Sequence, residues 1–165
     1  MSPINIRKGE YVFHRQHGLG EITSIHDNSF SGHAAACYVN LYFRRDELTM
    51  TVLEKNLQSV VRDLISLEQA QDLLGQIQAW NDKPEARWKA RADANQAALD
   101  SGDPFEYVNV LVGLAHLETE GALRLRDREH ANRSLRLLTE ELACVLQESQ
   151  QHVRGLLDQT IGVSL

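Results

Sequence analysis

A tryptophan surrounded by cations is the feature of this sequence whose residue types and spacing could do chemistry. Trp88 is followed by Lys89, and the further cations Lys83, Arg87 and Arg91 lie close by in the chain. Ammonium and guanidinium groups bind phosphates, and a large flat ring can stack on a base or wedge beside it. We therefore take Arg87, Trp88, Lys89 and Arg91 as candidate DNA-binding residues, and we expect no catalytic residues.

Two simpler interpretations of this cluster stay open. On a helix, Trp88 shares a face with Ala92, Asn95 and Leu99, so the indole could be a core residue, although Asn95 is a poor neighbour for it. The cations could form a solvated helix surface without any ligand. The solvent exposure of Trp88 is the observation that separates these interpretations from contact with DNA.

A second basic run lies further along the chain. Its members are Arg124, Arg126, Arg128, Arg133 and Arg136. They are interleaved with Asp127 and Glu129, so charge pairing along a helix surface explains the run without a ligand. Contact of these arginines with DNA phosphates is the alternative.

Charge and composition limit what these clusters could do. The formal net charge is −6, and residues 64–165 hold the whole acidic excess. Domains that bind nucleic acid by themselves are normally basic, so any DNA contact should be local and should need help from another protein. The hydrophobic content of 42% is typical of a globular protein. No apolar run approaches the ~20 residues that span a bilayer, and the N-terminus lacks a signal pattern. We therefore expect a cytoplasmic protein without a membrane partner.

The histidines invite a metal hypothesis that their spacing does not support. His14, His17, His26 and His33 lie in the same part of the chain as Cys37, but only His14 and His17 form a close pair. A structural zinc ion needs about four converging ligands, usually arranged as tight pairs. The sequence also lacks a glycine-rich phosphate loop and an arrangement typical of a catalytic nucleophile. We expect no metal, no cofactor, no small-molecule substrate and no enzymatic activity.

Two hydrophobic periodicities divide the chain. Residues 9–62 contain short alternating segments separated by turns, with the longest apolar run at 34–43 and a turn at 27–32. Several short strands at this spacing predict a small, strongly bent β barrel of the Tudor or SH3 type.

From Ser66 onward the apolar residues have helical spacing. Ser66 opens the first helix with a capping box. Asp103 and Pro104 begin a helix that is apolar on most sides and should be the buried centre. The fold class is thus predicted to be α+β, with an N-terminal barrel domain of residues 1–64 followed by an all-α helical bundle domain of residues 65–165.

Residues 6–146 contain a series of short, loosely defined motifs. They are Lys8-Gly9-Glu10-Tyr11-Val12-Phe13, His17-Gly18-Leu19-Gly20-Glu21-Ile22, Tyr38-Val39-Asn40-Leu41, Leu48-Thr49-Met50-Thr51-Val52, Val61-Arg62-Asp63-Leu64-Ile65-Ser66, Trp88 with its basic neighbours, Ser101-Gly102-Asp103-Pro104 and Glu140-Glu141-Leu142-Ala143. With these motifs the chain resembles the CarD/CdnL family of bacterial transcription regulators. Its first half also resembles the RNA-polymerase-interacting module of the transcription-repair coupling factor.

The resemblance implies a role for each half. In that family the barrel docks on the β subunit of RNA polymerase by adding strand to strand. A tryptophan of the helical domain wedges into promoter DNA at the upstream edge of the bubble and modulates the stability of the open complex. By position Trp88 matches that wedge, and Tyr38, Met50, Thr51 and Val52 are the expected polymerase-binding residues. Contact with promoter DNA is expected only in the polymerase complex.

A second function stays open beside this one. The chain could be a protein-interaction adaptor that kept the barrel but lost contact with DNA. Ala90 stands at a position that is often basic in the family, and Asp93 adds an acid nearby, which favours the adaptor. Tyr38, Met50 and Val52 could also be ordinary barrel residues, since one alternating set of a sheet must face outward.

Overall fold

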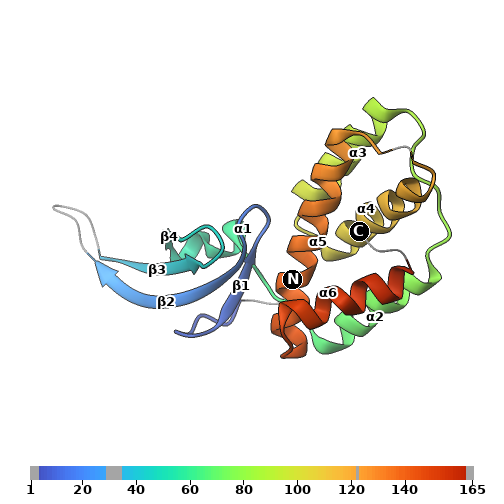
Figure 1. Ribbon diagram of the computed structural model, residues 1–165. Coiled ribbons are helices and arrows are strands. Elements are labelled where there is room, and N and C mark those ends of the chain that lie inside the picture. The colour runs from blue at the N-terminus through green and yellow to red at the C-terminus, as the bar shows by residue number, and fades with distance from the viewer. Residues whose placement is uncertain (1–3, 29–34, 122, 163–165) are drawn as a thin grey trace. The chain divides into compact units, whose positions relative to one another are not determined.

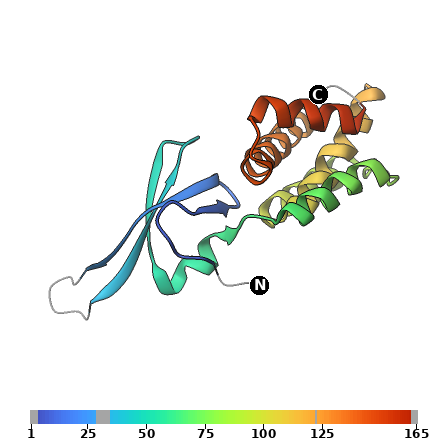
Figure 2. The same cartoon turned by 90° about the horizontal axis from the view of Figure 1, so that it is seen from below.

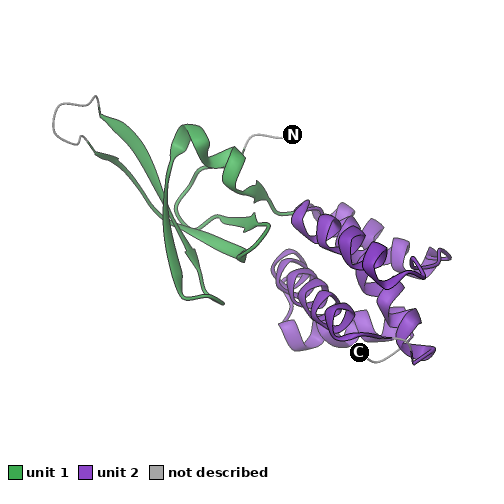
Figure 3. Cartoon of the chain, turned by 90° about the horizontal axis from the view of Figure 1, so that it is seen from above, with its two compact units in different colours: residues 1–64 green, residues 65–165 purple. Residues whose placement is uncertain are grey.

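The computed structural model describes residues 4–28, 35–121 and 123–162 of the chain. The chain divides into two compact units, residues 1–64 and 65–165 (Figure 3). Strands make up the first unit and helices the second, so the fold class is α+β, as the sequence predicted. Each unit is described by itself below.

The first unit is a five-stranded antiparallel sheet (Figure 1). Its elements are β1 (Tyr11–His14), β2 (Gly18–Asn28), β3 (Ala36–Phe43), β4 (Leu48–Leu53), the 3-10 helix η1 (Glu54–Asn56), α1 (Leu57–Val60) and β5 (Arg62–Asp63). In Figure 2 the β2–β3 pair extends well beyond the shorter strands. Of the turn predicted at 27–32, Asp27 and Asn28 belong to β2, and the rest lies outside the described residues, as does His33.

The prediction of a closed barrel is wrong for the part of the chain that the structure describes. The strands are hydrogen-bonded in the order β4-β3-β2-β1-β5, so β4 and β5 are edge strands. β5 is only two residues long and pairs with β1. A strand of this length cannot supply the ladder that would join the two edges, and the sheet stays open.

Alternating apolar side chains of the strands supply the core of this unit. The residues of that core with 0% exposure are Val12, Ile22, Val39, Leu41, Phe43 and Leu57. Gly20 is required at its position in β2, because a Cβ atom there would lie 2.6 Å from the Phe43 ring. The opposite set of side chains along each strand faces away from this core.

The second unit is a bundle of five helices. They are α2 (Leu67–Ala79), α3 (Trp88–Asp100), α4 (Pro104–Thr119), α5 (Leu125–Leu146) and α6 (Gln150–Ile161). α4 is the buried centre, as predicted, and it packs against α2, α3 and α5. Ser66 forms the predicted capping box at α2, and the Asp103 side chain accepts a hydrogen bond from the N–H of Phe105 at 2.9 Å. No helix in the described part is long and apolar enough to cross a membrane.

Helix α6 was not predicted from the sequence. α5 ends at Gln147, whose left-handed backbone (φ 55°) reverses the chain, and Ser149 caps the new helix by accepting from the N–H of His152. Val153 and Leu157 are fully buried, and α6 packs against α5 and α2. A signal was available, because Val153, Leu156, Leu157 and Ile161 have helical spacing after the Ser149 cap.

Candidate nucleic-acid interface

Trp88 presents its indole to solvent. It is the first residue of α3, and 44% of its surface is exposed. A tryptophan that packed in the core of the bundle would be largely buried. The interpretation of Trp88 as a core residue is therefore wrong, and the ring is accessible to a ligand.

Cations surround the Trp88 ring. The Arg124 guanidinium carbon lies 5.2 Å from the ring centroid and the Lys89 Nζ lies 5.5 Å from it, both within the range of cation–π attraction. Arg87 is also near in the chain, with 82% of its side chain exposed, and its Nε lies 3.4 Å from a carboxylate oxygen of Glu85. We call Arg87, Trp88, Lys89 and Arg124 the Trp88 patch. Arg124 comes from the start of α5, so the fold brings it to a ring that lies far away in the sequence.

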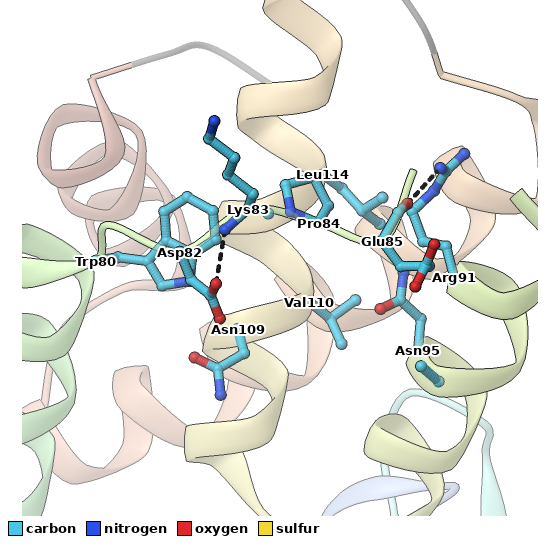
Figure 4. A pocket seen from close by; sticks show the side chains of 12 residues that line it. Trp80, Asp82, Lys83, Pro84, Glu85, Arg91, Asn95, Asn109, Val110 and Leu114 are labelled. Carbon is cyan, nitrogen blue, oxygen red and sulfur yellow. Dashed lines mark hydrogen bonds between the residues drawn. The ribbon is translucent and has the colours of Figure 1, made fainter. Parts of the chain in front are cut away.

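The loop of residues 80–87, which leads to Trp88, is anchored on α4. The Trp80 ring stacks on His116, with 4.9 Å between the centroids and 16° between the planes. Below the loop, α3 and α4 leave a cavity of about 150 Å³ that Trp80, Pro84 and Val110 help to line (Figure 4). Ligand pockets usually hold about 300–1,000 Å³, so this cavity is small for an organic ligand. We therefore assign it no ligand.

Arg91 is not part of the exposed patch, although the sequence places it among the candidates. It is only 4% exposed. Its Nε and Nη2 donate to the two carboxylate oxygens of Asp127 at 2.8 and 2.7 Å, and its Nη1 donates to the backbone oxygens of Glu85 and Ala86. Figure 4 shows the contact with Glu85. These bonds occupy the guanidinium, so we leave Arg91 out of the proposed DNA contacts.

Asp127 connects α3 with the start of α5, the two elements whose residues form most of the Trp88 patch. Besides binding Arg91 of α3, its carboxylate accepts from the N–H of Arg124 at 3.0 Å, which caps α5. Burial would raise the pKa of Asp127, but the hydrogen bonds from Arg91 and Arg124 hold it below the ordinary value. Sequence reasoning treated Asp127 as a surface charge. Its capping role could have been predicted from its position in the first turn of α5, where a carboxylate is favoured.

His130 lies one turn after Asp127 and is buried as well. It is 2% exposed, and its Nε2 lies 3.2 Å from the Gln96 Oε1. Its Nδ1 has no hydrogen-bond partner among the described residues. Burial, followed by the charge of Arg126, lowers the pKa of His130 below its ordinary value of 6.5. Burial thus disfavours the charged form of the imidazole in the folded unit.

We expect the second unit to lose stability as the pH falls below about 6.5, because only the unfolded chain then protonates His130. The free energy of unfolding should fall by up to about 1.4 kcal/mol per pH unit until the pH reaches the lowered pKa. Urea unfolding between pH 7.5 and 5.5, followed by tryptophan fluorescence, measures this unit, since Trp80 and Trp88 both lie in it. His130→Leu should flatten the dependence and the exposed His152→Gln should not. Equal slopes for the two variants would contradict the expectation.

Charge pairing accounts for most of the second basic run. The pairs are Arg126–Glu129 at 3.0 Å, Arg128–Glu118 at 3.6 Å and Arg133–Asp100 at 3.3 Å. Arg124 instead contacts the Trp88 ring. Arg136 has no ion pair with any described residue. The run is thus neither uniformly paired nor a continuous basic surface.

The candidate polymerase-binding residues of the first unit differ in exposure. Val52 is buried in the core, and Met50 is partly buried against it. Thr51 is exposed, and its hydroxyl donates to the Asn40 Oδ1 at 2.8 Å. Tyr38, on β3, stacks on His26 with centroids 6.0 Å apart. Only Thr51 of the three β4 candidates therefore has an exposed side chain, whereas the backbone of the whole edge strand lies at the border of the sheet.

The side chains of His14 and His17 make contacts within the first unit. His14 Nδ1 accepts from the backbone N–H groups of Gln16 and His17, and His17 Nδ1 lies 2.7 Å from an oxygen of Asp46. Among the residues that the structure describes, no group of three or more potential ligands is placed to hold a metal ion.

Comparison with known proteins identifies the family. Residues 72–158 match the family model described as CarD, C-terminal domain. The match extends past residue 146 into α6, further than the resemblance seen in the sequence. No curated protein matches the chain. CarD-family proteins are regulatory proteins rather than enzymes, and they generally interact with RNA polymerase. The matched region covers more than half of the chain, which therefore belongs to the CarD family of transcription regulators.

Proposed function

We propose that the protein docks on the β subunit of RNA polymerase through its first unit and contacts promoter DNA at the upstream edge of the bubble through the Trp88 patch. Docking places the patch at DNA that the polymerase has already opened, and the contact changes the lifetime of the open complex. The protein would then act in the cytoplasm, where RNA polymerase works.

The observation that carries the DNA contact is the exposed Trp88 indole, which has the cations of Arg124 and Lys89 within 5.5 Å of its ring centroid. A ring in this setting can enter a distorted base step while the cations bind the flanking phosphates. The formal charge of −6 opposes binding to free duplex. Docked polymerase supplies the effective concentration that the protein lacks by itself.

The open edge of β4 supports the docking. The backbone of an edge strand offers N–H and C=O groups to a strand of another protein, and this mode of binding asks little of the side chains. β4 pairs with β3 on one side only. Thr49 and Thr51 have exposed side chains along this strand, whereas Val52 belongs to the core. The proposed contact is therefore the β4 backbone, flanked by the two threonines, and Val52 acts by holding the strand in place.

A charge placed beside this edge should weaken docking. We expect Thr49→Asp to reduce the affinity for a β-subunit fragment roughly tenfold, because an unpaired carboxylate beside an added strand must be desolvated. Gln58→Glu adds the same charge at an exposed position of α1 and should change the affinity less than twofold. Biolayer interferometry with the full chain measures both. Equal affinity for Thr49→Asp and wild type would exclude β4 as the docking edge.

A further inference from the structure

A groove between α5 and α6 combines two arginines that have no acidic partner in the part of the chain that the structure describes. The groove holds about 520 Å³, within the range of ligand sites. Arg136 of α5 and Arg154 of α6 line it, both exposed. Neither makes an ion pair or a side-chain hydrogen bond with the described part of the chain. Their neighbours on α5 behave differently, since Arg126, Arg128 and Arg133 each bind a carboxylate.

The other polar groups of the groove also suit an anion. The side-chain amides of Asn132, Gln150 and Gln151 line it, and no Asp or Glu does so. Gln150 and Gln151 open the 12-residue helix α6, where backbone N–H groups and the helix dipole favour negative charge. This arrangement lies in the half of the chain that carries the whole acidic excess. The groove is therefore positively charged although the unit as a whole is acidic.

We propose that this groove binds a short acidic peptide segment of a partner protein, with carboxylates paired to Arg136 and Arg154. Guanidinium binds carboxylate through two parallel hydrogen bonds, and the amides can donate to the remaining oxygens.

Charge decides between a peptide and duplex DNA as the occupant. A duplex carries a charge about every 1.7 Å along its axis, so it would bring many phosphates near the acidic residues of this unit. A peptide with two or three carboxylates can enter the concave groove with little of this repulsion.

The groove is separate from the Trp88 patch. Arg136 follows Arg124 by twelve residues on one helix, which is a distance of ~18 Å along the axis. An acidic segment in the groove therefore leaves the ring of Trp88 free. The site adds a protein contact to the second unit and does not depend on the contact between Trp88 and DNA.

The test is an NMR titration of the full chain with a seven-residue peptide that holds four glutamates among glycine and serine. We expect salt-sensitive binding, with shifts of the Arg136 and Arg154 Nε–H signals, and no binding of the peptide with glutamine in place of glutamate. Arg136→Gln and Arg154→Gln should each weaken binding at least fivefold. Arg126→Gln removes the same charge from a paired, exposed position of α5 and should change it less than twofold.

Four results would overturn the proposal. The first is no binding of the glutamate peptide, and the second is an equal loss in Arg126→Gln, which would mean that only net charge matters. The third is a stronger effect of Arg136→Gln and Arg154→Gln on binding of a 12-base-pair duplex than on the peptide, which would make the groove a phosphate site. Sedimentation of the same variants shows whether the groove instead holds a second copy of the chain. A fall in self-association without a loss of peptide affinity would also count against the proposal.

Discussion

Replacing Trp88 by Ala should shorten the lifetime of open promoter complexes five- to a hundred-fold, while polymerase binding stays unchanged. In the proposed function the ring meets DNA only when the bubble is open, so its removal should penalise that state selectively. Stacking of one base on an aromatic side chain contributes about 1–3 kcal/mol, which sets this range. The measurement is the decay of open complexes after a competitor is added, with saturating amounts of each variant.

The exposure of Trp88 makes this experiment cleaner than it would be for a core residue. Trp→Ala in a protein core costs about 3–5 kcal/mol, whereas a side chain that is 44% exposed should cost much less. Leu67→Ala is a matched control, because Leu67 is another exposed apolar residue at the start of a helix, with 55% of its surface exposed. It should leave the lifetime unchanged.

The companion variant Arg124→Gln tests the cation that the fold adds to the patch. It should shorten the lifetime less than Trp88→Ala, because it removes the cation–π contact and one proposed phosphate contact but leaves the ring. A stable Trp88→Ala protein with an unchanged lifetime would refute the wedge. The protein-interaction adaptor would then be the better account of the second unit.

Local sequence patterns predicted much of the fold but not its long-range contacts. Alternating and helical periodicities indicated strands before helices, and the caps at Ser66 and Asp103 lie where the sequence placed them. Whether β5 closes the sheet depends on pairing between distant strands, which no local pattern encodes. The faces of β4, by contrast, follow from the local pattern, since Met50 and Val52 alternate with exposed threonines and Val52 is the buried residue.

The candidate site shows this difference most clearly at two arginines. Arg91 follows Trp88 on the same helix, so the sequence places it beside the ring. Instead, the Arg91 guanidinium is buried in the bundle, where it donates to the carboxylate of Asp127, a residue far away in the sequence. Arg124 takes a place beside Trp88 although the sequence separates them widely. Which cation faces solvent is thus decided by the packing of α3 on α5, a contact that residue types and spacing do not reveal.

Replacing Asp127 by Ala should destabilise the second unit by about 3–5 kcal/mol, because it leaves the Arg91 charge buried without a partner. It also removes the carboxylate that caps α5 at the N–H of Arg124. Urea unfolding followed by tryptophan fluorescence measures the loss. Asp100→Ala breaks an exposed ion pair with Arg133 between the same two helices, and it should cost less than about 1 kcal/mol.

Two further measurements separate a buried charge from a simple loss of packing. The pKa of Asp127 is lowered in the folded unit, so its contribution is present above the ordinary value near 3.8 and is lost as the pH falls through the lowered pKa. The double variant Arg91→Met with Asp127→Leu removes both charges and should be more stable than Asp127→Ala alone. If the double variant is the less stable of the two, the cost lies in the hydrogen bonds that Arg91 makes to the loop before Trp88 rather than in an uncompensated charge. In either case the Arg91–Asp127 pair ties the loop before Trp88 to the start of α5, the two segments that carry the Trp88 patch.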